Sequence, residues 1–71
     1  MKTLERIQSN IYDEIYEGIN GNKKVHCILD DHCVRYVVTD LRKPRNNGTR
    51  HEFPNDKKEL CYKNALKALN K

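Results

Sequence analysis

Two adjacent runs of β-branched and aromatic residues constrain the fold of this chain more than any other feature. They span residues 25–29 and 33–39, and Asp30-Asp31 between them is typical of a tight turn. Alternate residues of a strand point to opposite faces, so each run presents one mainly apolar face. The residues on these two faces are Val25, Cys27, Leu29, Val34, Tyr36 and Val38. The sequence therefore predicts a β-hairpin with these residues in the core.

Two further elements are predicted after the hairpin. Residues 49–53 are expected to form a third strand, because Asn47-Gly48 before them is a strong hairpin-turn signal. A final helix follows Pro54, with Asn55 or Asp56 as its N-cap. Its apolar residues form one broad stripe: Leu60, Cys61, Tyr62, Ala65, Leu66, Ala68 and Leu69.

The segment before the hairpin has the spacing of an amphipathic helix. Its apolar residues recur at steps of three and four, at Leu4, Ile7, Ile11, Ile15 and Ile19. Gly18 and Asn20-Gly21-Asn22 are expected to end this helix, because they tolerate positive φ. The predicted fold class is therefore α+β, in the order α-β-β-β-α. A three-stranded antiparallel sheet with both helices packed on one face would form a single domain over residues 1–71.

Charge is unevenly distributed along the chain. Residues 1–31 carry four basic and six acidic side chains, whereas residues 32–71 carry ten basic and four acidic ones. The net charge of +4 therefore comes from the second half. A basic surface beside an acidic one is the electrostatic footprint of a protein that binds a polyanion.

A lysine pair, Lys57-Lys58, begins the final predicted helix, where the helix dipole already favours anions. The segment 57–69 resembles the second helix of double-stranded-RNA-binding domains, which opens with a lysine pair and ends near an Ala-Leu. His32 and Tyr36 fit the spacing of that family's loop histidine and the aromatic residue after it. The resemblance implies recognition of A-form RNA by shape, with Lys57 and Lys58 on phosphates and His32 in a minor groove.

A second family with the order α-β-β-β-α is that of the HicA-type messenger-RNA interferase toxins. His32 stands where that family has a histidine that acts in RNA cleavage, with Asp30-Asp31 in place of its Gly-Ser. A histidine can act as general base toward a ribose 2′-hydroxyl. The resemblance therefore implies an alternative, a ribonuclease toxin that uses His32. The sequence contains no glycine-rich phosphate loop or serine nucleophile motif that would indicate another enzyme.

The sequence thus predicts a non-catalytic protein that binds structured or double-stranded RNA through a basic loop and a helix N-terminus. The residues predicted to bind RNA are Lys57, Lys58, His32, Arg42, Lys43, Arg45, Arg50 and Lys63. Two alternatives stay open besides simple RNA binding. One is the toxin, and the other is a small inhibitor that binds an acidic protein partner.

The three cysteines, Cys27, Cys33 and Cys61, are predicted to be reduced thiols in a cytoplasmic protein. Their odd number and the lack of a secretory signal argue against a disulfide framework. His26-Cys27 and His32-Cys33 hold zinc-type ligands, but strand alternation is expected to point Cys27 and Cys33 to opposite faces. No metal or other cofactor is therefore predicted. No apolar run approaches the roughly 18 residues of a membrane span, so no membrane partner is predicted.

Overall fold

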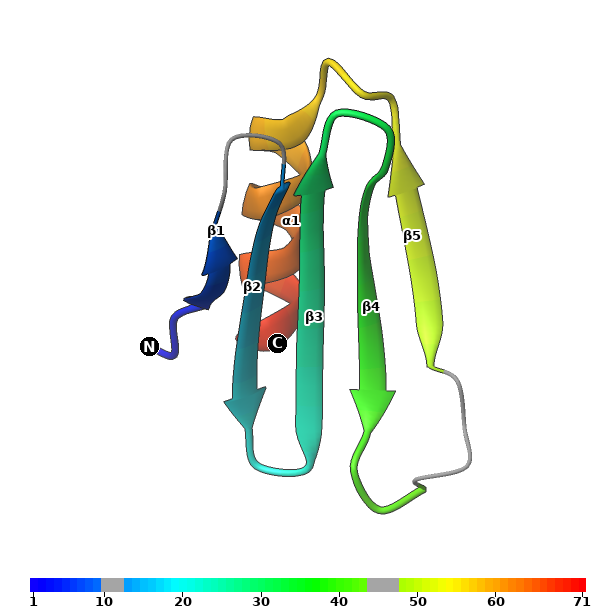
Figure 1. Cartoon of the computed structure of the whole chain (residues 1–71). Helices are drawn as coiled ribbons and strands as arrows, with labels where there is room; N and C mark the ends of the chain where they lie inside the picture. The colour runs from blue at the N-terminus through cyan, green and yellow to red at the C-terminus, as the bar shows by residue number, and fades with distance from the viewer. Residues whose placement is uncertain (10–12, 44–47) are drawn as a thin grey trace.

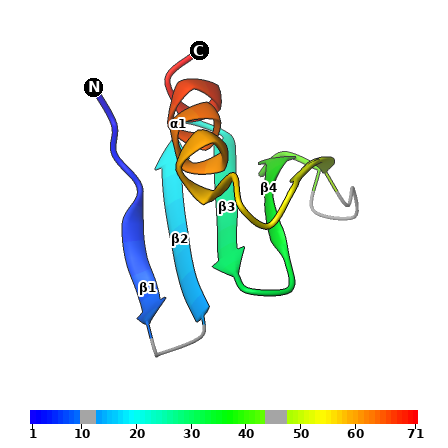
Figure 2. The same cartoon turned by 90° about the horizontal axis from the view of Figure 1, so that it is seen from above.

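The computed structural model describes residues 1–9, 13–43 and 48–71 (Figure 1). The elements in chain order are β1 (Glu5–Ser9), β2 (Asp13–Asn20), β3 (Lys23–Asp30), β4 (Val34–Asp40), β5 (Thr49–Phe53) and α1 (Lys58–Leu69). The strands form one antiparallel sheet whose spatial order equals the chain order. Helix α1 lies on one face of this sheet and packs mainly against β3 and β4 (Figure 2). No other described element covers the second face, which is turned toward the viewer in Figure 1.

The predicted fold class is wrong, because the N-terminal segment forms β1 and β2 instead of a helix. β2 pairs with β3 along its whole length, from Asn20 opposite Lys23 to Asp13 opposite Asp30. Isoleucine and tyrosine are frequent in this segment and favour strands, and the long ladder with β3 outweighs the helical spacing. Of the predicted stripe, only Leu4 belongs to the core, and Ile11 lies outside the described residues.

The hairpin of β3 and β4 confirms the predicted core. Val25, Cys27, Leu29, Val34 and Tyr36 are buried, and Val38 packs against them. The tight turn lies one residue later than predicted, at Asp31-His32. The hydrogen bond that closes it runs from the Asp30 amide to the Cys33 carbonyl, at 2.9 Å. Since a shift of one residue on each strand preserves the pairing of the faces, the core residues are unaffected.

Strand β5 occupies the predicted residues, and α1 follows it with a different start. The predicted N-cap at Asn55 or Asp56 is wrong: Lys57 is the N-cap residue and makes no side-chain capping bond. Cys61, Ala65 and Leu69 form the buried edge of α1. Asn47 of the predicted turn lies outside the described residues, whereas Gly48 has a φ of 79°.

Gly18 on β2 brings the end of α1 close to the sheet. A Cβ atom at Gly18 would lie 2.6 Å from Leu69 Cδ2 and 3.1 Å from the Thr3 carbonyl oxygen. Next to this contact, the Asn20 side-chain amide donates to the Leu69 carbonyl at 2.9 Å. The glycine predicted to end a helix therefore has another role, which is to leave room for helix packing.

The strands extend beyond the C-terminal end of α1. A helix of 12 residues is about 18 Å long, whereas a strand of eight residues is about 26 Å long. Figure 1 shows the helix ending before the lower ends of β2, β3 and β4. Part of the helix-side face is therefore uncovered at that end of the sheet.

Candidate nucleic-acid interface

The two ends of the sheet differ in charge. We use the name basic end for one region of the molecule. It contains the β2–β3 turn, the end of β4, the start of β5 and the C-terminus of α1. Its basic side chains among the described residues are Lys23, Lys24, Arg42, Lys43, Arg50, Lys67 and Lys71. The acidic groups among them are Asp40 and, on the rung that also holds Arg50, Glu5 and Glu17. Glu17 pairs with Lys24 at 3.2 Å. This end of the molecule therefore carries a strongly positive potential.

The opposite end of the sheet is acidic on balance. It contains the β3–β4 turn, the end of β5 and the start of α1. Its acidic side chains among the described residues are Glu14, Asp30, Asp31, Glu52, Asp56 and Glu59. The basic residues there are fewer: Arg35, Lys57 and Lys58. The charge asymmetry found along the sequence thus becomes an asymmetry along the strands.

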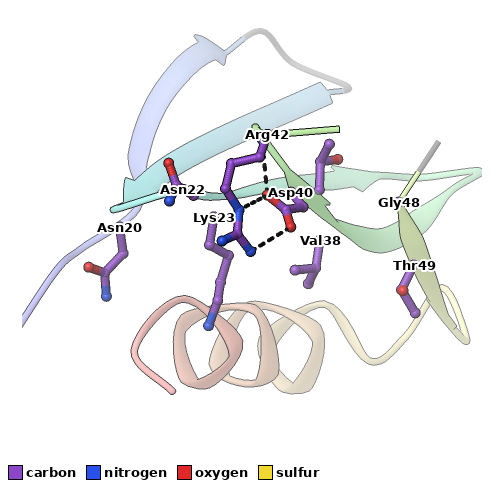
Figure 3. Close-up of a pocket in the computed structure, with 9 residues that line it drawn as sticks. Asn20, Asn22, Lys23, Val38, Asp40, Arg42, Gly48 and Thr49 are labelled. Carbon is purple, nitrogen blue, oxygen red and sulfur yellow. Dashed lines mark hydrogen bonds and ion pairs between the residues drawn. The ribbon is translucent and has the colours of Figure 1, made fainter. Parts of the chain in front are cut away.

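Hydrogen bonds hold the two connections of the basic end together. The Leu41 amide donates to the Asn22 carbonyl at 2.6 Å, which joins the end of β4 to the β2–β3 turn. Arg42 donates from Nε and Nη2 to the two carboxylate oxygens of Asp40, at 3.1 and 3.0 Å (Figure 3). These bonds, together with one from the Arg42 amide, lower the pKa of Asp40 to about 2. Asp40 therefore stays ionised and fixes the direction of Arg42.

Lys23 offsets the negative end of the α1 dipole. Its Nζ donates to the Ala68 carbonyl at 2.8 Å and to a Lys71 main-chain oxygen at 3.2 Å. The unpaired carbonyls of a helix C-terminus carry a partial negative charge, which a cation stabilises. Lys23 therefore offsets the negative potential that the C-terminus of α1 would otherwise add to the basic end.

A pocket opens where the strands extend past the helix (Figure 3). Its volume is about 410 Å³, within the range of small-ligand sites. The residues that line it are Asn20, Asn22, Lys23, Val38, Thr39, Asp40, Arg42, Gly48 and Thr49. Side-chain amides, hydroxyls, one guanidinium, one ammonium and one carboxylate thus surround a space accessible from solvent.

Several cations of the basic end are available to a ligand. Lys43, Lys67 and Lys71 are exposed, and their ammonium groups have no ion-pair partner within the described residues. Arg50 lies 3.8 Å from Glu52, and both of these side chains are more than half exposed. Exposed pairs of this kind contribute little and are readily exchanged for a phosphate.

The residues predicted to bind RNA do not form one site. Arg42, Lys43 and Arg50 lie at the basic end, whereas Arg45 lies outside the described residues. Lys57, Lys58 and His32 lie at the opposite end. There, Lys58 Nζ donates to Asp31 at 3.0 Å. Lys63 lies on the outer side of α1 and pairs with Glu59 at 3.4 Å.

Four basic residues of this interface were missed by the sequence analysis. Lys23 and Lys24 belong to a segment whose summed charge is acidic, so they carried no signal by composition. Lys67 and Lys71 gave no separate signal, because lysines near the C-terminus of a helix are expected from the helix dipole alone. The pairing of β3 with β4 brings Lys23 opposite Asp40, and the packing of α1 brings its C-terminal lysines to the same end of the sheet.

The three histidines lie at separate places and share no catalytic arrangement among the described residues. His32 is exposed in the β3–β4 turn, where its amide donates to Asp30 at 3.1 Å. His26 bonds Glu17 at 2.7 Å on the sheet face opposite α1. His51 stacks on Tyr36 with the ring centroids 4.6 Å apart. None of the three histidines lines the pocket of the basic end.

The cysteines are free thiols, and two of them lie in the core. Cys27 Sγ and Cys61 Sγ are 4.0 Å apart, and burial raises the pKa of both thiols. Cys33 is half-buried. Within the residues that the structure describes, no three His, Cys, Asp or Glu side chains gather in a way that could hold a metal ion.

Comparisons of the chain with known protein families, curated proteins and solved structures gave no match. The order α-β-β-β-α, on which both family resemblances drew, is not the order of this chain. In the described part of the chain, no helix is long and apolar enough to cross a membrane. A function for this protein therefore has to be argued from its geometry and charge.

Proposed function

We propose that this protein binds RNA through its basic end, by contacts with the sugar-phosphate backbone. The observation that supports this most is the gathering of seven Lys and Arg side chains from four separate segments beside three carboxylates, Asp40, Glu5 and Glu17. Neutralising phosphates with such side chains releases counterions, which supplies affinity without regard to base sequence.

The pocket supports a backbone ligand more than a base. Arg42 can present its outer N–H groups to a phosphate while Asp40 holds it in place. Thr39 and Thr49 offer hydroxyls next to it, and such groups can bond a ribose 2′-hydroxyl, which DNA lacks. No aromatic side chain lines the pocket, so base stacking contributes little there. We therefore expect a preference for RNA over DNA and little preference for sequence.

A titration with single-stranded RNA, double-stranded RNA and duplex DNA of equal length tests this proposal. Affinity for RNA should fall steeply between about 50 and about 200 mM salt. The variant K43E/K67E changes two lysines of the basic end whose ammonium groups have no ion-pair partner among the described residues. It should weaken binding by about tenfold or more, because two phosphate contacts become repulsions.

The matched control is K57E/K63E, which changes the net charge equally but away from the basic end. Binding by this variant should stay within about threefold of the unchanged protein. Equal losses for the two variants would show that net charge alone matters, and loss for the control alone would place the site at the start of α1. Recovery of shortened RNA would instead direct attention to His32.

A further inference from the structure

Strand β5 lies beside helix α1 rather than beneath it. The helix packs mainly against β3 and β4, and β5 forms one edge of the sheet (Figure 1). Residues paired across antiparallel strands share a face. The β4 partners of Thr49, His51 and Phe53 belong to the core or pack against it, so these three residues lie on the helix side. Phe53 is half-buried, whereas Thr49 and His51 are exposed.

His51 presents an exposed aromatic ring on a fixed support. Its ring stacks on that of Tyr36, with the centroids 4.6 Å apart and the planes 17° from parallel. Tyr36 is only 8% exposed and also contacts Phe53, so the support is part of the core. Within the described residues, His51 makes no second ring contact, and its ring nitrogens make no hydrogen bond. A ring held in one orientation before a ligand arrives loses less entropy on binding.

The ring of His51 lies next to the pocket of the basic end. Thr49 lines that pocket, and two residues of a strand separate it from His51 by about 7 Å on the same face. Arg42, which Asp40 holds in place, lines the same pocket. Glu52 alternates with His51 along β5 and therefore points to the opposite face. One nucleotide can thus reach the pocket with its phosphate and ribose and His51 with its base.

We infer that His51 is a stacking platform for a base of single-stranded RNA whose sugar-phosphate backbone occupies the pocket. This inference deepens the proposed function and rests on it. Histidine is among the aromatic side chains on which unpaired bases stack, and such stacking tolerates any base. The bases of a duplex are paired and stacked on one another, so they cannot reach His51. The protein should therefore prefer single-stranded to double-stranded RNA.

A packing role alone for His51 predicts a different result. The ring covers Tyr36, so its removal would expose part of the core and lower stability whatever the ligand. A stacking role predicts a loss of affinity that depends on whether the ligand carries bases. The decisive comparison is therefore between two ligands that differ only in their bases.

Fluorescence anisotropy with a labelled oligouridylate about eight nucleotides long measures the contribution of the bases. The comparison ligand has the same sugar-phosphate backbone without bases. The unchanged protein should bind the oligouridylate at least about fivefold more tightly, which is the lower range for stacking on one aromatic side chain. The ratio of the two affinities should be the same at about 50 and about 200 mM salt, because stacking releases no counterions.

Three variants assign this ratio to one ring. His51→Ala should lower the affinity for oligouridylate to that for the backbone without bases, and leave the latter within about twofold. His51→Phe should keep the ratio, because it keeps an aromatic ring. His32→Ala is the matched control, since it removes an exposed histidine at the opposite end of the sheet, and it should also keep the ratio. Circular dichroism and thermal unfolding check that each variant is folded.

The ring protons of His51 give a second readout that needs no variant. With saturating oligoadenylate, the ring current of a stacked adenine should shift their NMR signals upfield, while those of His32 stay in place. Equal affinities for the two ligands, equal losses for both in His51→Ala, or an unmoved His51 signal would overturn the inference and leave backbone binding intact. Binding of neither ligand would overturn the inference and the proposed function together.

Discussion

The two faces of the sheet are built from the same strands but are completed in different ways. On the covered face, Val25 and Cys27 are fully buried because α1 closes over them. On the opposite face, which no described element covers, their strand neighbour Ile28 is only half-buried. Residues of similar hydrophobicity therefore contribute unequally to stability, according to whether a partner surface is present within the chain. Stability should therefore depend mainly on the covered face.

The largest expected effect is on the covered face. Leu69, the last residue of α1, is fully buried against Gly18. Leu69→Ala should therefore lower the free energy of unfolding by about 2–5 kcal/mol. Urea denaturation followed by circular dichroism measures this loss. The matched variant Leu60→Ala, on the exposed side of the same helix, should change it by less than about 0.5 kcal/mol. Similar losses for both would contradict the helix orientation.

A second variant tests the close approach of α1 to β2. Gly18→Ala should destabilise by about 1–3 kcal/mol, because its Cβ would overlap Leu69 and the Thr3 carbonyl. This overlap exceeds the gain of about 0.5–1 kcal/mol that alanine normally brings over glycine in a strand. Adding Leu69→Val should recover part of the loss in the same denaturation experiment. Strictly additive losses would show that the two residues do not touch.

The face of the sheet opposite α1 should respond less. Ile28→Ala should lower the free energy of unfolding by about 1 kcal/mol, because the side chain is only half-buried. Urea denaturation beside Leu69→Ala measures the difference between the two faces. Equal losses for the two variants would contradict the unequal burial of these side chains.

The smallest effect concerns a carboxylate on the helix side, beyond the end of α1. The pKa of Asp40 is lowered to about 2 by Arg42, so the stabilisation is present above the ordinary pKa of about 3.9 and disappears as the pH falls toward 2. Because this pair lies at the surface, where water and salt screen it, the effect on unfolding is slight. A carbon-detected NMR titration should find its midpoint near 2, and Arg42→Gln should raise it toward 3.9. An unchanged midpoint would rule out the pairing with Arg42.

The part of the fold after residue 23 was predictable because each element carries its own local signal. The alternation of apolar residues identified the core residues of β3 and β4, and the turn signal that ends at Gly48 predicted β5. The stripe of α1 was equally clear, although its first turn was misplaced. The absence of a capping side chain at Lys57 removes the signal on which helix starts depend.

The part before residue 23 was not predictable from spacing alone. A step of four residues fits one face of a helix and, being even, also one face of a strand. Ile15 and Ile19 therefore satisfy both periods, and only the non-local ladder with β3 decides between them. A second non-local ladder, between β3 and β4, was needed to bring Lys23 and Lys24 to the end of β4 beside Arg42, so the candidate interface was predictable only in part. Its loop residues were identified, whereas its lysines from other segments were not.

The position of α1 after all five strands has a consequence for synthesis of the protein. A nascent chain emerges from its N-terminus, so the whole sheet is made before the helix that covers its core. During that interval both faces of the sheet are apolar and accessible, and the edge strands β1 and β5 are unpaired on their outer sides. Chaperones should therefore engage the chain at this stage, and release it once Leu69 has reached Gly18.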